Sequence, residues 1–480
     1  MTTRSHRLSP LWFLVGLGLM IGAVGGVLRG LAGRPNWGSL QREAAYVWTN
    51  HETAPGTAMF GYLPTAVFAL WPFMVWTPQP LGLGLYVLCN VLAAAGTFWC
   101  VHRWWLLRPV PVYSYAWPVL LTVTNFAHVI QGNQLTLWAL FLSVAGLALA
   151  ERGRPFFGGV LVGAAGLVKC LPFLLVGYLL LRRRWRALAG VVTAILLLDI
   201  APSVVVFGWN GAVREHRAWL QRAEWHSARR QIEDPLQTNL TRHASNFSYA
   251  SVLARWLRRL PNAQWLLLYS GDASEDVVAQ GRAALRPDET LAVNPMPSRT
   301  GQWRVERISL ADVPRFHVAD LSAGVVRGIW AVSLAIGMGA LAWLTWRTGR
   351  DGPAEAWPAL ASLWMLAMFW VTPMMRPYYL AMAFPAVVVV WQMLIREAER
   401  NGYRWTSGTA LAAIALLAWP LGLVSLGWHR GRWYGIHLAV LAILIVATAW
   451  SWRRIREAAH AASPRARPRE SRTRSTASTG

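Results

Sequence analysis

Ionisable side chains inside apolar segments are the residues of this sequence best suited to chemistry. Lys169 stands in the octet GLVKCLPF (166–173) and is the only lysine in the chain, whereas every other cation among the 46 Lys and Arg residues is arginine. Asp199 and Arg376 also lie within or at the end of apolar segments. Because an uncompensated charge at membrane depth costs several kcal/mol, such residues indicate a functional site by default.

Each of these residues also has a structural interpretation. Asp199 could form a structural ion pair, and Arg376, beside prolines at a helix end, could extend its side chain to the membrane surface. Asn125 and His128 suit hydrogen bonds between membrane helices. The remaining amides of this group lie at one helix end: Gln131, Asn133 and Gln134.

Cations beneath one face of a membrane, with a carboxylate in a neighbouring loop, suit an anionic lipid headgroup such as a phosphate-linked lipid. Cations neutralise the phosphate, and they stabilise it as a leaving group when negative charge develops there. A carboxylate can act as general base on an acceptor hydroxyl. The combination predicts group transfer from a lipid phosphate.

The composition is that of a polytopic membrane protein. The 480 residues are 55% hydrophobic and only 14% charged, whereas soluble domains average about 25% charged residues. The net charge of +24 does not indicate nucleic-acid binding, because no base-reading motif accompanies it. The arginines cluster instead at the ends of apolar blocks, as expected for cytoplasmic loops.

Eleven apolar segments have the length expected of transmembrane segments. They are residues 11–31, 80–102, 113–131, 134–151, 156–181, 187–207, 323–347, 355–373, 378–396, 407–427 and 433–452. Residues 63–76 are too short to span and are interpreted as an interfacial or re-entrant piece.

One segment is predicted to be a re-entrant hairpin. The basic sequences HRWWLLR (102–108) and ERGR (151–154) fall in the cytoplasm if the N-terminus does. RRRWR (182–186) would then lie outside unless 156–181 enters and leaves by the same face. The sequence KCLP at its centre supports a turn, because proline cannot continue a helix. A missed crossing elsewhere is the alternative.

This topology places the polar loops on the external face and both termini in the cytoplasm. The external loops are 32–79 and 208–322, with interfacial helices and a small β-containing insert at 262–320. The transmembrane domain is assigned to 1–457. Residues 458–480, rich in Ser, Thr, Arg and Pro, are interpreted as a disordered basic tail.

No soluble-enzyme motif is present in the sequence. It contains no Walker A loop, HExxH or GxSxG motif, which argues against an ATP-driven pump and against hydrolases of those types. Cys89, Cys100 and Cys170 lie in apolar segments and show no metal-ligand spacing. They are interpreted as packing residues.

Several strings together resemble bacterial glycosyltransferase family 87. Residues 132–188 combine a GN/GQ turn, an RGR joint, a Gly-rich helix, K-x-x-P and an arginine run. FGYLPTAVFALWPF (60–73) is similar to the family's aromatic-Tyr-Pro-Pro element, although Leu63 precedes the single Pro64. NFSYASVLARWLRR (246–259) and TPMMRPYYLAMAFP (372–385) resemble its external helix and its late helix start. The resemblance covers about residues 8–430 in order.

The resemblance implies an all-α GT-C-type fold and hexosyl transfer, with inversion, from a polyprenyl-phosphate sugar. The family includes polyprenol-phosphate-mannose-dependent mannosyltransferases, so mannose is the expected sugar. Lys169 matches the K-x-x-P lysine, and Arg376 lies at the late motif. The implied donor-phosphate residues are Lys169, Arg376, Asn133 and Gln134, and the implied lining residues are Tyr62, His128, Asp199, Asn246 and Tyr378.

The first external loop departs from the family at the position of the catalytic acid. The resemblance implies an Asp there, but residues 34–62 contain none. Glu43 is the nearest substitute, with His51 and Glu52 behind it. A loop without a competent base is the other interpretation.

The leading hypothesis is a multi-pass cell-membrane glycosyltransferase acting on a lipid or glycan acceptor at the external face. The sequence indicates no cofactor; a divalent cation is compatible with the chemistry, but no Asp-rich cluster requires one. The partners expected are the donor, the acceptor and membrane lipids, with no nucleic acid. The alternatives are a transporter or flippase of a lipid-linked or anionic solute, which would usually show internal repeats, and an inactive lipid-binding relative.

Overall fold

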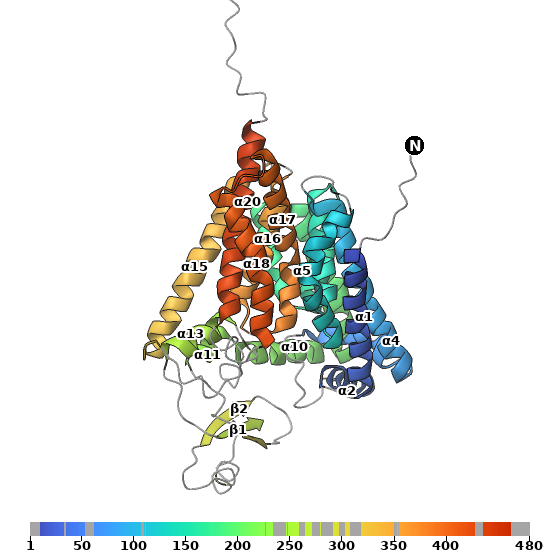
Figure 1. The fold of residues 1–480 in the computed structure, drawn as a ribbon. Coiled ribbons are helices and arrows are strands. Elements are labelled where there is room, and N and C mark those ends of the chain that lie inside the picture. Colours follow the sequence, from blue (N-terminus) through green and yellow to red (C-terminus); the bar gives the residue numbers. More distant parts are fainter. Residues whose placement is uncertain are drawn as a thin grey trace, which may run out of the picture.

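The protein folds as a helical bundle with a group of shorter elements at one end, in a computed structural model (Figure 1). The structure describes residues 10–32, 35–52, 62–106, 110, 112–225, 227–233, 246, 248–258, 265–270, 279, 291–296, 303–307, 318–349, 353, 355–373, 375–427 and 435–461. The expected N-terminal cytoplasmic residues Met1–Arg7, much of the 262–320 insert and residues 462–480 lie outside this described part.

The bundle contains helices from both halves of the chain. Its elements are α1 (Pro10–Leu31), α4 (Gln79–Cys100), η1 (Val101–Trp105), α5 (Val112–Gln131), α6 (Thr136–Glu151), α7 (Pro155–Val168), η2 (Leu171–Phe173), α8 (Leu174–Leu181), α9 (Trp185–Ile195), η3 (Leu196–Ile200), α15 (Ala323–Thr348), α16 (Trp357–Val371), η5 (Pro377–Ala383), α17 (Phe384–Arg400), α18 (Ser407–Gly427) and α20 (Ile436–Ala461). The elements at the end of the bundle are α2 (Pro35–Asn50), α3 (Pro64–Met74), the second part of α10 (Ala201–Trp225), α11 (Ala228–Glu233) and α13 (Tyr249–Leu257).

Helix coincides with every apolar segment expected to span the membrane. Within the described residues, six helical stretches are long and apolar enough to cross a membrane, and five further apolar helices have only 10–17 residues. The protein is therefore an all-α polytopic membrane protein in its main body. The helix α20 continues to Ala461, past the expected domain limit at 457, and the residues after Ala461 lie outside the described part of the chain.

Residues 155–184 fold back on themselves. A Cβ on Gly159 would lie 1.8 Å from the Ala187 carbonyl oxygen, and one on Gly163 would lie 2.7 Å from the Ala194 Cβ. The later residue of α7 thus lies beside the later residue of α9. The two helices therefore run in the same direction, with their backbones in contact. The chain between them must consequently reverse, and the reversal lies at Lys169, where α7 ends with extended backbone (φ −156°, ψ 118°).

Glu151 joins the two ends of this folded-back segment. Its carboxylate lies at the end of α6, just before α7, and accepts hydrogen bonds from Arg182 Nη2 (3.2 Å), Arg184 and the Tyr178 hydroxyl (2.7 Å). Arg182 also donates to the carbonyl oxygen of Gly349, after α15. The segment thus begins and ends at one end of the bundle, while its reversal lies at the other end of α6, beside Thr136.

A kink at Gly208 (φ 66°, ψ 167°) turns the chain out of the bundle. The first part of α10 continues α9, and the second part lies across the end of the bundle (Figure 1). Only glycine adopts this φ and ψ combination readily. Gly208 therefore allows the chain to change direction where the apolar run ends at 207. The following Trp- and Arg-containing residues are those expected to form an interfacial helix.

A second, small core lies beside α10. Ala228, Ile232, Ala250, Ala254 and Val326 form this core where α11 and α13 meet the first turn of α15. Ser248 and Ser322 cap α13 and α15, because each hydroxyl accepts a hydrogen bond from the backbone N–H three residues later. These contacts attach α11 and α13 to the bundle.

Three short strands lie in the chain between α13 and α15. They are β1 (Trp265–Ser270), β2 (Leu291–Met296) and β3 (Trp303–Arg307), in the order β2-β1-β3. β1 is parallel to β2, with Leu267 opposite Val293, and antiparallel to β3, with Leu267 opposite Val305. Figure 1 draws the strands beyond the end that carries α11 and α13.

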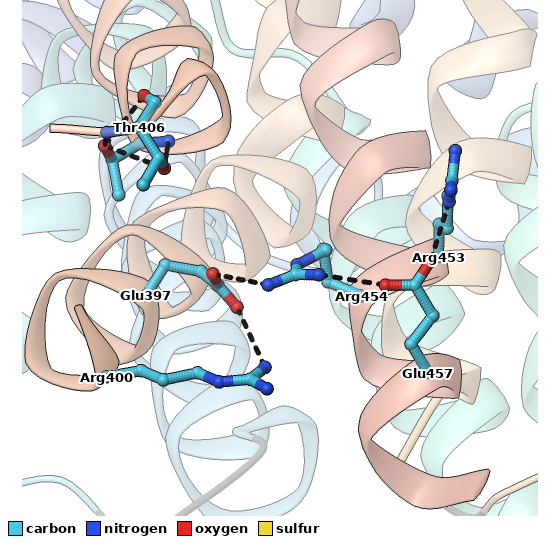
Figure 2. Close-up of polar contacts among 7 residues, drawn as sticks. Glu397, Arg400, Thr406, Arg453, Arg454 and Glu457 are labelled. Atoms are coloured by element: carbon cyan, nitrogen blue, oxygen red, sulfur yellow. Dashed lines mark hydrogen bonds and ion pairs between the residues drawn. The ribbon is translucent and has the colours of Figure 1, made fainter. Parts of the chain in front are cut away.

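Ion pairs connect α17 and α20 at the opposite end. Figure 2 shows Arg454 between Glu397 and Glu457, with nitrogen-to-oxygen distances of 2.9 Å to each, and Arg400 beside Glu397. The Glu397 side chain is 5% exposed and that of Glu457 is 43% exposed. The contact to Glu397 is therefore the better shielded of the two.

Candidate functional site

Lys169 lies in a cage of hydroxyl and aromatic groups. Its Nζ donates to Thr136 Oγ1 at 2.7 Å. The same Nζ lies 4.1 Å from the ring centroid of Tyr379, 4.7 Å from that of Tyr378 and 5.8 Å from that of Tyr62. Lys169 is 5% exposed. We call these five residues the lysine cage.

The lysine cage surrounds Lys169 Nζ with aromatic rings and a hydroxyl, and no described carboxylate lies beside it. Aromatic faces attract a cation, and the attraction is stronger when water is excluded. Among the residues that the structure describes, no carboxylate lies within 4 Å of Lys169. The ammonium therefore keeps most of its capacity to bind an anion.

The cage residues come from four separate segments. Lys169 stands at the reversal after α7, Thr136 at the start of α6, and Tyr62 two residues before α3. Tyr378 and Tyr379 stand in η5, whose first residue is Pro377. Proline is favoured at the first helical position because its fixed φ suits a helix start.

Two of the predicted phosphate-binding residues, Gln134 and Arg376, extend the cage. The Tyr62 hydroxyl donates to Gln134 Oε1 at 3.2 Å. Arg376 is half-buried directly before η5 and interacts electrostatically with Tyr378 and Tyr379. Within the described chain, Arg376 has no carboxylate within ion-pair distance. Two cations thus approach the same pair of phenols.

Asn133 has a structural position instead. Its φ is 49°, its Nδ2 donates to the Gly26 carbonyl at 3.1 Å, and its own carbonyl accepts from the Tyr86 hydroxyl at 3.1 Å. Asn tolerates this left-handed backbone better than most residues. Asn133 therefore fixes the turn between α5 and α6 against α1 and α4, and this turn carries Gln134 toward Tyr62.

Asp199 pairs with a residue that the sequence analysis did not select. Its Oδ2 lies 3.0 Å from Nε2 of His216, and Nδ1 of the same ring lies 2.8 Å from the Ala212 carbonyl oxygen. Both ring nitrogens face acceptors, an arrangement that favours the doubly protonated imidazolium. Asp199 also interacts electrostatically with Cys170, the neighbour of Lys169. No local pattern links positions 199 and 216, because the Gly208 turn creates their contact.

Glu43 lies on the buried face of α2. It shares that face with Trp37, Leu40 and Val47, and it is 1% exposed. Trp37 packs on Tyr86 with ring centroids 5.3 Å apart. Trp37 of this face thus contacts α4, and Tyr86 of α4 also donates to the Asn133 carbonyl oxygen in the turn preceding Thr136.

The other two catalytic candidates of this loop, His51 and Glu52, directly follow the last residue of α2. Glu52 Oε1 accepts from the Tyr46 hydroxyl at 3.1 Å, and exposed His51 has φ 54°. They close the end of the helix rather than sharing the buried face of Glu43.

Two lining candidates and one amide lie outside the cage. His128 is exposed on α5 and interacts with Arg29 of α1. Asn125 is buried in α5 and accepts a weak hydrogen bond of 3.5 Å from Thr124. Asn246 is fully buried and bonds to the chain that precedes Arg376.

The structure therefore brings together some of the selected residues. Lys169, Arg376, Gln134, Tyr62 and Tyr378 gather at one place, and Thr136 and Tyr379 join them. Thr136 and Tyr379 were not selected from the sequence. Tyr379 could have been found more easily, because it follows the selected Tyr378. Thr136 carried no signal, because threonine is common within membrane helices.

Lys169 and Arg376, which both interact with Tyr378 and Tyr379, are groups that can bind a phosphate and stabilise it as a leaving group. The lysine supplies a compact charge, and the arginine supplies a planar pair of donors.

Comparison with known proteins identifies one matching family. Residues 60–294 match the model of glycosyltransferase family 87. The matched region contains Tyr62, Gln134, Lys169 and Asp199, whereas Glu43 and Arg376 lie outside it. No curated protein and no solved structure matches the chain.

Proposed function

This chain is a glycosyltransferase family 87 protein over residues 60–294, and from this premise we propose that it transfers a hexose from a polyprenyl-phosphate sugar to a lipid or glycan acceptor. Mannose is the first sugar to test. The family indicates a membrane glycosyltransferase, and the donor class, the sugar and the acceptor are our proposal.

The proposed reaction is a single displacement at the anomeric carbon. The acceptor hydroxyl oxygen forms a bond to C1 of the sugar while the bond from C1 to the phosphate oxygen breaks. The electron pair of that bond remains on the polyprenyl phosphate, and the hydroxyl proton passes to a protein carboxylate. Attack from the side opposite the phosphate inverts the configuration at C1.

The observation that carries the proposal is the set of groups that surround Lys169 Nζ in the lysine cage. Lys169 is buried, and its described partners are one hydroxyl and three aromatic rings. A buried cation is normally paired or neutralised, so this ammonium suits an anion supplied from outside the protein. Arg376 suits a second oxygen of the same phosphate.

We propose Glu43 as the general base, in place of the Asp implied by the family resemblance. It lies in the first external loop and on the buried face of α2. Asp199 is the second candidate, because it lies near Cys170 and is held by His216.

We further propose that the lysine cage opens to the external face. Eleven crossings or re-entrant segments, of GT-C type, would then place both termini in the cytoplasm. The fold-back of residues 155–184 supports this topology, because its two ends meet at Glu151 and its apex lies at the end of α6 that begins with Thr136.

A donor screen tests the proposal directly. Purified protein in lipid vesicles is given mannosyl, glucosyl and arabinosyl polyprenyl phosphates with a membrane acceptor fraction, and the glycosylated product is measured. We expect transfer from the mannosyl donor by the wild type and a loss of at least about 100-fold in Lys169→Ala, from the loss of transition-state stabilisation. Arg404→Ala, an exposed cation at the other end of the bundle, should retain full activity.

Other outcomes of the screen separate the alternatives. Full activity of Lys169→Ala would overturn the role of the lysine cage. Movement of a lipid-linked solute across the vesicle without any glycosylated product would favour a transporter. No product from any donor, with donor still bound, would favour an inactive relative.

A further inference from the structure

A cluster of buried polar side chains lies between the external helices and the lysine cage. It consists of Gln231 on α11, Asn246, and Ser248 and Ser251 at the start of α13. All four are 0% exposed. We call this group the amide cluster.

The members of the amide cluster are bonded to one another. Asn246 Nδ2 donates to Ser251 Oγ at 2.8 Å, and Asn246 Oδ1 accepts from the Ser248 backbone N–H at 3.2 Å. Ser251 Oγ donates to Gln231 Oε1. Arg255 Nη1 donates to the Asn246 carbonyl oxygen at 2.9 Å, which also fixes the backbone of Asn246. Such fully bonded buried networks are rigid.

The amide cluster also bonds the chain that connects α16 to η5. Asn246 Oδ1 accepts from the Met375 backbone N–H at 2.9 Å. Gln231 Nε2 donates to the Pro373 carbonyl oxygen at 2.6 Å, and Asn246 Nδ2 lies 3.4 Å from the same oxygen. Two amide side chains thus satisfy one donor and one acceptor of this connection.

The connection held in this way leads directly into the site. Arg376 follows Met375, and Tyr378 and Tyr379, which line the lysine cage, follow Pro377. Arg376 lies between Met375, whose N–H is bonded to the amide cluster, and Pro377, whose ring fixes its own φ. The backbone on both sides of Arg376 is therefore restrained. A fixed backbone at Met375 is therefore a fixed origin for Arg376.

We propose that Asn246 and Gln231 are positioning residues that set Arg376 against the donor phosphate. They act on the backbone of Pro373 and Met375 and do not contact the substrate. This inference rests on the proposed function for its activity test. It also revises the role of Asn246, which the sequence analysis expected to line the site.

A double-mutant cycle separates positioning from general stabilisation. Gln231→Met keeps the length of the side chain and removes its hydrogen bonds. Loss of a buried hydrogen bond is expected to lower kcat/KM for the donor roughly 10-fold, with most of the change in KM. In an Arg376→Ala background the same substitution should change kcat/KM less than about 2-fold, because coupled sites are not additive.

Ser251→Ala on α13 is a milder variant of the amide cluster, and a buried serine on α16, Ser362, gives its matched control. Ser251→Ala removes a hydrogen bond of the amide cluster and should raise KM, whereas Ser362→Ala removes a hydroxyl that is equally buried but has no partner among the described residues. Ser362→Ala should keep wild-type KM. The proposal would be overturned if Gln231→Met lowered kcat/KM equally in the wild type and in Arg376→Ala. It would also be overturned if both Gln231→Met and Ser251→Ala left the kinetics unchanged.

Hydrogen exchange tests the cluster without reference to activity. The amide of Met375 should exchange slowly in the wild type and at least about 10-fold faster in Asn246→Ala, while amides within α16 stay unchanged. Fast exchange at Met375 in the wild type would overturn the proposal even in an active enzyme. If exchange behaves as expected but no donor is used, the proposed function fails, and the role assigned to the cluster in placing a donor-binding Arg376 fails with it.

Discussion

At the residue scale, the lysine cage explains why one lysine stands in a chain of arginines. The space around Nζ is limited by Thr136 at 2.7 Å and by the Tyr379 and Tyr378 rings at 4.1 and 4.7 Å. An ammonium is a compact charge with three donors, whereas a guanidinium is a planar fork that needs more room. The cage accordingly suits lysine at its centre and leaves arginine for the more open position 376.

The two carboxylate candidates can be distinguished by kinetics. If Glu43 is the base, Glu43→Gln should lower kcat by roughly 10²–10⁴-fold at saturating donor, because the amide cannot take the proton. Asp199→Asn should then lower kcat less than about 10-fold, through loss of the His216 pair. The measurement is initial rate of product formation in vesicles with the donor that the screen identifies.

His51→Gln is the control for that comparison, since His51 is exposed at the far end of α2. It should retain wild-type kcat. A larger effect for Asp199→Asn than for Glu43→Gln would assign the base to Asp199 instead.

At the element scale, the folded-back segment α7–η2–α8 depends on a buried ion-pair cluster. Glu151 and Arg182 side chains are each 2% exposed, and Arg184 and Tyr178 complete the set. Removing one partner of a buried pair leaves the other charge uncompensated. The cluster therefore controls whether the two legs stay together, and so whether Lys169 stays at Thr136.

Glu151→Gln should destabilise the protein by about 3–5 kcal/mol, because Arg182 would remain buried without its counter-charge. The measurement is thermal unfolding of the purified protein in detergent, read as a fall in melting temperature. Glu457→Gln, which removes a 43% exposed partner of Arg454, is the control and should cost only ~0–1 kcal/mol. Equal effects of the two substitutions would contradict the interpretation.

The elements were largely predictable from the sequence, and the site only partly. Segment boundaries such as 323–347 and 407–427 agree with α15 and α18 because apolar length is a local property. The chain reverses at Lys169, but the re-entrant path through the membrane that the position of RRRWR indicates stays a prediction. Thr136, Tyr379 and His216 were missed because their contacts with Lys169 and Asp199 join separate segments, and no local spacing encodes such contacts.

At the scale of the whole molecule, the two ends of the bundle differ in composition. One end carries α2, the second part of α10, α11 and α13, while the other carries the ion pairs of Glu151 and the Glu397–Arg454 group (Figures 1 and 2). The beginning of α1 and the end of α20 lie at the end that carries the ion pairs. The orientation expected from the positive-inside rule would place this end in the cytoplasm, and this orientation stays a prediction.

Single-cysteine labelling can test that orientation. In a background with Cys89, Cys100 and Cys170 changed to Ala, Val318→Cys and Trp405→Cys are introduced at positions that are 66% and 74% exposed. A membrane-impermeant maleimide on intact cells should label position 318, because it precedes α15 at the external end. Position 405 should be labelled only after the membrane is permeabilised, and the reverse pattern would invert the topology.

The ion-pair cluster at Glu151 also bears on how the chain is synthesised. Glu151 leaves the ribosome 31 residues before Arg182, so the carboxylate must wait for its partner until both legs of the folded-back segment have been made. Until then, α7 can pack on α6, where a Cβ on Gly158 would lie 2.5 Å from the Gly146 carbonyl oxygen, but it still lacks α9, which begins at Trp185 after both legs. The lysine cage is thus completed late in translation, since Tyr378 and Tyr379 also follow this segment in the chain.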